Sequence, residues 1–287
     1  MSKHSTSQSQ MIKVNKTKKR IIMVILIVIA IIQLFPLYWL VSFSLKNNAE
    51  IFAGNIIGLP EVYRFSNYSV ALANGEIIGY FLNSVLVTCT TVIVSSVLGA
   101  MAAYAIVRMK WKLSKITLLL FLTGLMIPLH AVLLPLFVVL RDLDMLNSYL
   151  ALILPYTAFS LPVAIFIFTG FLESIPKEME EAACIDGANI YRTFFSIIIP
   201  MLKPAIATVA IFTFLSNWNE LMFAVTFISD KAFKTLPVGI RAFVSKYTTD
   251  WGPIGASMVI AVLPTIGIYT LLSKQVQESF RAAGIKG

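Results

Sequence analysis

Long apolar runs separated by short polar stretches dominate the chain. Each run has about 20 residues or more, and an α-helix of about 20 residues is long enough to cross a ~30 Å hydrocarbon core. The pattern therefore predicts an all-α polytopic membrane protein with six transmembrane helices, at residues 21–45, 80–107, 116–140, 149–172, 200–227 and 253–273.

Composition supports this fold class. Of the 287 residues, 58% are hydrophobic and only 13% are charged, whereas soluble domains carry about a quarter charged residues. The first apolar run is longer than the ~7–15-residue core of a signal peptide and offers no small-residue cleavage site, so we interpret it as an uncleaved span. The predicted organisation is a basic tail at 1–20 and a single transmembrane domain at 21–287, which ends in a tail at 274–287.

The distribution of Lys and Arg predicts the orientation. Basic residues are densest at 13–20 and 108–115, KVNKTKKR and RMKWKLSK, and loops rich in Lys and Arg stay on the cytoplasmic side. Both termini are then cytoplasmic, and the protein lies in the cell membrane, surrounded by lipid. The net charge of +9 does not indicate nucleic-acid binding, because the basic residues are spread over loops instead of one soluble face.

Residues 174–199, between the fourth and fifth spans, have the character of a soluble helical loop on the cytoplasmic side. Ser174 is predicted to cap a helix, with Pro176 in its first turn. Acidic residues then complement the positive N-terminal end of the helix dipole: Glu178, Glu180 and Glu181. Asp186-Gly187 is predicted to end this helix, because glycine tolerates the left-handed conformation of a C-terminal turn. A second short helix from about 188 would lead to Pro200, where the fifth span is predicted to begin.

This loop has two interpretations, an amphipathic helix on the membrane surface or a docking element for another protein. Membrane-surface helices usually carry Lys and Arg toward anionic lipid, whereas this one is acidic. Its small residues would also let another surface approach the backbone closely, namely Ala182, Ala183 and Ala188. Both features favour a protein partner.

The stretch EAACIDGANIYRTFFSIIIP resembles the EAA loop of permease subunits in binding-protein-dependent ABC importers. The positions that match at the family's spacing are Glu181, Ala182, Ala183, Gly187, Ile197 and Pro200, while Ile199 replaces the family's leucine. Further segments resemble the carbohydrate-importing, maltose-type branch, among them MIPLHAVLLPLF (126–137), SNWNELMFAV (216–225) and the ending AAGIKG (282–287).

The resemblance implies a transport subunit and not an enzyme. The loop would act as a coupling helix in a groove of a cytoplasmic ATPase, with Glu181 as the main polar contact and Gly187 permitting the turn; the implied coupling residues are Glu181, Ala182, Ala183, Asp186, Gly187 and Pro200. It also implies a second homologous permease, two ATPase copies and an external sugar-binding protein. The sequence contains no G-x-x-x-x-G-K-[ST] phosphate loop, so ATP and magnesium would be bound by the ATPase and this chain would hold no cofactor.

Trp218, Asn219 and Glu220 are the candidates for the substrate pathway, because polar residues within a span are often functional. Trp218 could stack on a sugar ring, while Asn219 and Glu220 could bond its hydroxyls; the alternative is a cap at the outer interface. No metal site is predicted. An ion-coupled secondary transporter is the second hypothesis for the whole chain, but it would need a set of ionisable residues at mid-membrane, where the sequence offers only Glu220 and His130.

Overall fold

The computed structural model of the chain describes residues 16–74, 76–109, 111–243 and 249–284. These residues are nearly all helical and contain no β-strand, which confirms the all-α prediction. Four helices are long and apolar enough to cross a membrane: α1 (Lys16–Ser44), α4 (Ile77–Arg108), α7 (Leu150–Leu172) and α14 (Trp251–Gly284). Two further candidate spans are sharply bent, so the total is six if each bent pair counts as one span.

Helices α4, α7, α11 (Lys203–Trp218) and α14 form the bundle, and α4 packs most extensively on α7. Small residues make this packing close. A Cβ atom on Gly99 would lie 2.7 Å from the Cβ of Ala164, and Ala100 and Ala103 of α4 are also fully buried. Small side chains let membrane helices approach each other closely and gain dispersion contacts.

The predicted third span, 116–140, is not one kinked helix. Helix α5 (Ser114–Thr123) continues as the 3₁₀ turn η1 (Gly124–Met126), and η2 (Leu129–Val132) and α6 (Leu133–Asp142) follow at an angle of 91°. Ile127 and Pro128 are both extended at the break. Pro128 favours this break, because proline disfavours a helical conformation in the residue before it and cannot donate a helical hydrogen bond.

The predicted fifth span, 200–227, is also divided. Pro200 lies in α10 (Ile199–Met201), and α11 begins only at Lys203, with a 73° bend between the two stretches. At its other end α11 stops at Trp218, and α12 (Met222–Phe227) is a separate helix. The straight helix of this segment therefore begins at Lys203, while the start of the span at Pro200 stays a prediction.

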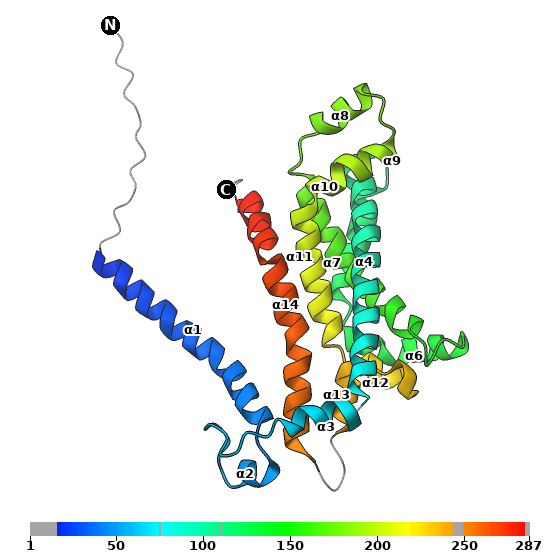
Figure 1. Cartoon of the computed structure of the whole chain (residues 1–287). Helices are drawn as coiled ribbons and strands as arrows, with labels where there is room; N and C mark the ends of the chain where they lie inside the picture. The colour runs from blue at the N-terminus through cyan, green and yellow to red at the C-terminus, as the bar shows by residue number, and fades with distance from the viewer. Residues whose placement is uncertain (1–15, 75, 110, 244–248, 285–287) are drawn as a thin grey trace.

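Helices α1 and α14 extend beyond the predicted spans. Helix α14 remains helical to Gly284, so most of the predicted tail at 274–287 continues the helix; residues 285–287 lie outside the described part, as do residues 1–15 of the basic tail. Helix α1 leans away from the bundle (Figure 1), and none of its most apolar 18-residue window is buried.

The polar segment between the first two long helices is folded and contains α2 (Asn48–Phe52) and α3 (Ser66–Asn74). Together with α12 and α13 (Leu236–Ala242) it closes one end of the molecule (Figure 1). Asn83 fastens this end, because its amide donates to the carbonyls of Ala232 and Lys234 at 2.8 and 2.9 Å. Helix α8 (Glu178–Ile185) and α9 (Ile190–Thr193) lie at the opposite end, where α4, α7 and α14 also have their C-terminal ends.

Candidate functional site

The turn between α8 and α9 is a Schellman motif. Helix α8 ends at Ile185, and Gly187 adopts the left-handed conformation with φ +77°. The Gly187 amide donates to the Cys184 carbonyl at 3.0 Å, and the Ala188 amide donates to the Ala183 carbonyl at 2.9 Å. These are the two hydrogen bonds that satisfy the last carbonyls of a helix in this motif. The predicted stop at Asp186-Gly187 is confirmed.

Helix α9 begins at a side-chain cap, since the Asn189 side chain accepts from the Arg192 amide at 2.9 Å. The chain then widens into one π-helical stretch, η3 (Phe194–Ile198), before α10. π-Helical stretches are rare and often occur at functional sites. This segment joins the loop to α11 across the 73° bend.

The predicted coupling residues differ in their exposure to solvent. Ala183 is buried, whereas the others are exposed: Glu181, Ala182, Asp186, Gly187 and Pro200. Large apolar side chains accompany them, because Ile185 is 87% and Tyr191 72% exposed. The loop therefore offers a neighbouring molecule a surface that combines acidic and apolar groups.

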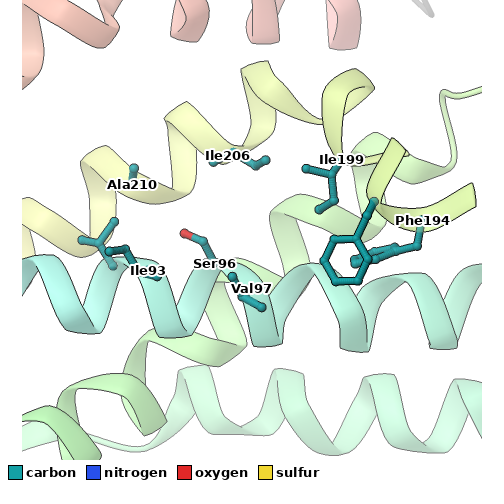
Figure 2. Close-up of a pocket in the computed structure, with 9 residues that line it drawn as sticks. Ile93, Ser96, Val97, Phe194, Ile199, Ile206 and Ala210 are labelled. Carbon is teal, nitrogen blue, oxygen red and sulfur yellow. The ribbon is translucent and has the colours of Figure 1, made fainter. Parts of the chain in front are cut away.

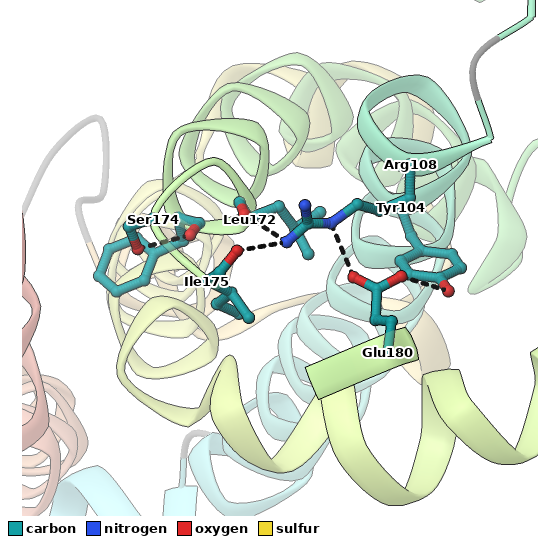
Figure 3. A network of polar contacts seen from close by, with 7 residues as sticks. Tyr104, Arg108, Leu172, Ser174, Ile175 and Glu180 are labelled. Carbon is teal, nitrogen blue, oxygen red and sulfur yellow. Dashed lines mark hydrogen bonds and ion pairs between the residues drawn. The ribbon is translucent and has the colours of Figure 1, made fainter. Parts of the chain in front are cut away.

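The base of α8 is held by an arginine from a different helix (Figure 3). Arg108, in the last turn of α4, forms an ion pair with Glu180, with Nε and Oε1 2.8 Å apart. Its Nη2 donates to the carbonyls of Leu172 and Ile175 at 2.9 and 2.7 Å. The two charged side chains are only 6% and 16% exposed. One guanidinium thus joins the C-terminal ends of α4 and α7 to the first turn of α8.

Tyr104 adds a second connection, because its hydroxyl donates to the other carboxylate oxygen of Glu180 at 3.1 Å. Its ring packs on Phe194 of η3, with the centroids 5.1 Å apart. Tyr104 therefore touches both halves of the loop. In the sequence analysis, Arg108 counted only among the basic residues and Tyr104 had no role. The sequence signal for the ion pair was an arginine and an acid, each at the end of a predicted segment on the same side of the membrane.

The predicted cap at Ser174 is wrong. Its hydroxyl donates backward to the carbonyl of Phe171 at 2.7 Å, and α8 starts later, at Glu178. Lys177 occupies the cap position without a side-chain hydrogen bond. The first turn of α8 nevertheless carries the three predicted acids, and one of them, Glu180, has the Arg108 guanidinium as its partner.

A cavity of about 240 Å³ lies between α7 and α11, beside the break in the third candidate span. Its wall is largely apolar but carries several polar side chains, and it is called the polar cavity below. Glu220 is at its edge, and its carboxylate accepts from the Tyr156 hydroxyl at 2.6 Å and from the Phe223 and Ala224 amides at 2.9 and 3.3 Å. The other polar groups that line the cavity belong to Ser160, Thr213, Ser216 and Asn217. Glu220 therefore both faces the cavity and anchors the first turn of α12.

Trp218 does not face this cavity and is 2% exposed. Its Nε1 donates to the Ala261 carbonyl at 2.9 Å, and its ring stacks on Phe214 with the centroids 5.2 Å apart. The Trp218 ring is therefore covered by protein, and its stacking on a sugar stays a prediction. Asn219 is exposed, and its amide donates to the Leu215 carbonyl at 2.9 Å.

An apolar cavity of about 290 Å³ lies between α4 and the η3–α11 segment (Figure 2). Ile93, Val97, Phe194, Ile199 and Ile206 are among the residues that line it. Ser96 contributes its only marked polarity, and within the described part of the chain the buried Ser96 hydroxyl has no hydrogen-bond partner. Packing between α4 and α11 is thus incomplete next to the π-helical stretch.

Comparison with known proteins identifies the family of this chain. Residues 95–281 match the family described as binding-protein-dependent transport system inner membrane component. The diacetylchitobiose uptake system permease protein NgcG of Streptomyces coelicolor is 35% identical, over 89% of this chain and 85% of that protein. The trehalose/maltose transport system permease protein MalG of Thermococcus litoralis is 33% identical, over 94% and 98% respectively.

A solved structure shares the fold. A chain of a bacterial ABC transporter involved in the import of the acidic polysaccharide alginate superimposes with a TM-score of 0.77, at 23% identity, over 91% of this chain and 98% of that one. The family match and the long apolar helices together define a multi-pass membrane subunit of a transporter. This chain belongs to the family of inner membrane components of binding-protein-dependent transport systems, and it resembles the permeases of sugar ABC importers.

Proposed function

We propose that this chain forms half of the translocation pathway of an ATP-driven sugar importer, with six spans and both termini in the cytoplasm. The observation that carries the proposal is the acidic, partly apolar α8–α9 loop at one end of a family-matched bundle. The sugar as substrate is supported by the names of its relatives, which include uptake systems for diacetylchitobiose, trehalose/maltose and melibiose/raffinose/stachyose.

The α8–α9 loop is the proposed contact with a cytoplasmic ATPase. Glu181 and Asp186 would supply polar contacts, the exposed Ala182 would let the partner approach, and Gly187 would shape the turn. The buried Ala183 would support the loop from within the chain, and the exposed Pro200 would lie where the loop leads back to α11. ATP and magnesium would be held by two copies of this ATPase, because the sequence has no phosphate loop. An external binding protein would deliver the sugar.

The substrate pathway is proposed to include the polar cavity beside α12. Glu220 and Ser216 line it, and hydroxyl, amide and carboxylate groups are the kinds of group that bond sugar hydroxyls. Asn219 directly precedes Glu220 in the sequence and is exposed.

A second permease is the proposed partner of α1. This helix has apolar side chains on every side, and its most apolar window is entirely unburied in the single chain. A photo-crosslinking residue in place of Ile32, which is 65% exposed, should form an adduct with the second permease. The same residue in place of Leu45, which is not exposed, is the control. Adducts with lipid alone at position 32 would contradict this partner.

Reconstitution tests the proposed function as a whole. The chain would be co-expressed with its cognate permease and ATPase, purified, and placed in proteoliposomes with the binding protein. We expect the ATPase to co-purify, and uptake of radiolabelled diacetylchitobiose, maltose or raffinose to require ATP. Uptake driven by a proton or sodium gradient, with no ATPase bound, would support the ion-coupled secondary transporter instead.

A further inference from the structure

The Arg108–Glu180 ion pair lies where three helices meet at the loop end of the bundle. Arg108 belongs to α4, and its guanidinium donates to the Leu172 carbonyl at the end of α7 and to the Ile175 carbonyl in the α7–α8 linker. Glu180 belongs to the first turn of α8. Each charge suits its place, since a cation stabilises helix C-termini and an anion stabilises an N-terminus. The linker between α7 and α8 is thereby bridged by side chains as well as by the backbone.

Burial makes this connection stiff. The two side chains are 6% and 16% exposed, so water does not readily replace either partner, and a buried charge without its partner is strongly unfavourable. The Tyr104 hydroxyl adds a hydrogen bond to the same carboxylate. Solvent-exposed pairs, in contrast, contribute little; the Arg141–Asp142 pair, at 58% and 59% exposure, is of that kind.

The other half of the loop is connected differently. It reaches α11 through the π-helical stretch η3 and a 73° bend. Phe194 of η3 packs on Tyr104 of α4, but an apolar cavity lies beside this contact, between α4 and the η3–α11 segment. Figure 2 shows this cavity between the two helices, with the Ser96 hydroxyl directed into it. Incomplete packing and an irregular helix permit displacement, whereas the buried ion pair opposes it.

We propose that Arg108 and Glu180 are positioning residues for transport. Their ion pair makes α8 one rigid unit with the ends of α4 and α7, so that a displacement of α8 reaches these two helices directly, while α11 shifts relative to them at η3. This inference rests on the proposed coupling of α8 to an ATPase. Neither residue contacts substrate; both act by fixing the angle of α8 to the bundle.

The test measures uptake per ATP hydrolysed in the reconstituted complex. The Glu180→Gln variant should still assemble with the ATPase and hydrolyse ATP. Its uptake per ATP hydrolysed, measured with the sugar that the wild-type complex imports, should be about tenfold lower than that of the wild type. Glu173→Gln is the matched control, because Glu173 is an exposed acid just before the α7–α8 linker, and its ratio should equal that of the wild type.

Tyr104→Phe removes only the hydroxyl and keeps the ring on Phe194. This variant therefore tests the positioning role if the Glu180→Gln variant does not assemble. Its expected ratio is about threefold lower than the wild type. A wild-type ratio in an assembled Glu180→Gln complex, or in Tyr104→Phe when Glu180→Gln does not assemble, would overturn the positioning role. Failure of the wild-type chain to bind an ATPase would instead overturn the proposed function.

Discussion

Gly187→Val is expected to abolish most ATP-driven uptake while the permease still enters the membrane. Gly187 has φ +77°, a conformation that costs an ordinary side chain about 1–2 kcal/mol and a β-branched one more. A Cβ atom there would meet nothing within 4 Å, so the penalty comes from the backbone and not from a clash. The Schellman turn would open, and α8 and α9 would no longer present one surface to the ATPase.

Gly187→Asn is the matched control, because asparagine tolerates the left-handed conformation. We expect at least roughly tenfold lower uptake for the valine variant and near-normal uptake for the asparagine variant. Equal losses of uptake in both variants would show that Gly187 is needed for close approach by the partner and not for its φ angle, since the space around Gly187 is open within this chain. Normal ATP-driven uptake in Gly187→Val would contradict the coupling role of the turn.

The sequence predicted the long elements well because they depend on local composition. Apolar length alone located α1, α4, α7 and α14 to within a few residues, except that α14 continues to Gly284. The sharp breaks in the third and fifth spans were not predicted, because apolar length does not report a bend. Pro128 breaks its helix, whereas Pro155 and Pro162 remain inside α7, half of whose apolar window is buried. Tertiary packing, not the proline itself, separates these outcomes.

The candidate loop was predictable to the extent that its turn is local. Gly187 and the acids of the first turn follow from residue type and spacing, and both are where they were expected. The partner of Glu180 was not predictable, since Arg108 lies 72 positions earlier on another helix. Trp218 shows the same limit, because nothing in its own segment indicates that Ala261 and Phe214 cover its indole.

Glu220→Ala is expected to lower the thermal midpoint of the purified permease and to reduce uptake. The change removes the acceptor of three donors, the Tyr156 hydroxyl and the amides of Phe223 and Ala224. All three residues are at most 3% exposed, and each unsatisfied buried group costs about 1–3 kcal/mol. We expect the free energy of unfolding to fall by about 3 kcal/mol in total. The affected groups lie at the start of α12 and in the wall of the polar cavity.

Asn219→Ala is the control for Glu220→Ala, because Asn219 is exposed and its side chain makes one hydrogen bond, to the Leu215 carbonyl. Its free energy of unfolding should stay within about 0.5 kcal/mol of the wild-type value. Glu220→Gln then separates the anchoring role from sugar binding. Its amide oxygen can still accept from the Phe223 amide, so the fold should hold, whereas loss of the negative charge weakens bonds from sugar hydroxyls. A raised KM with an unchanged thermal midpoint would place Glu220 on the substrate pathway, and an unchanged KM would leave it as the anchor of α12 alone.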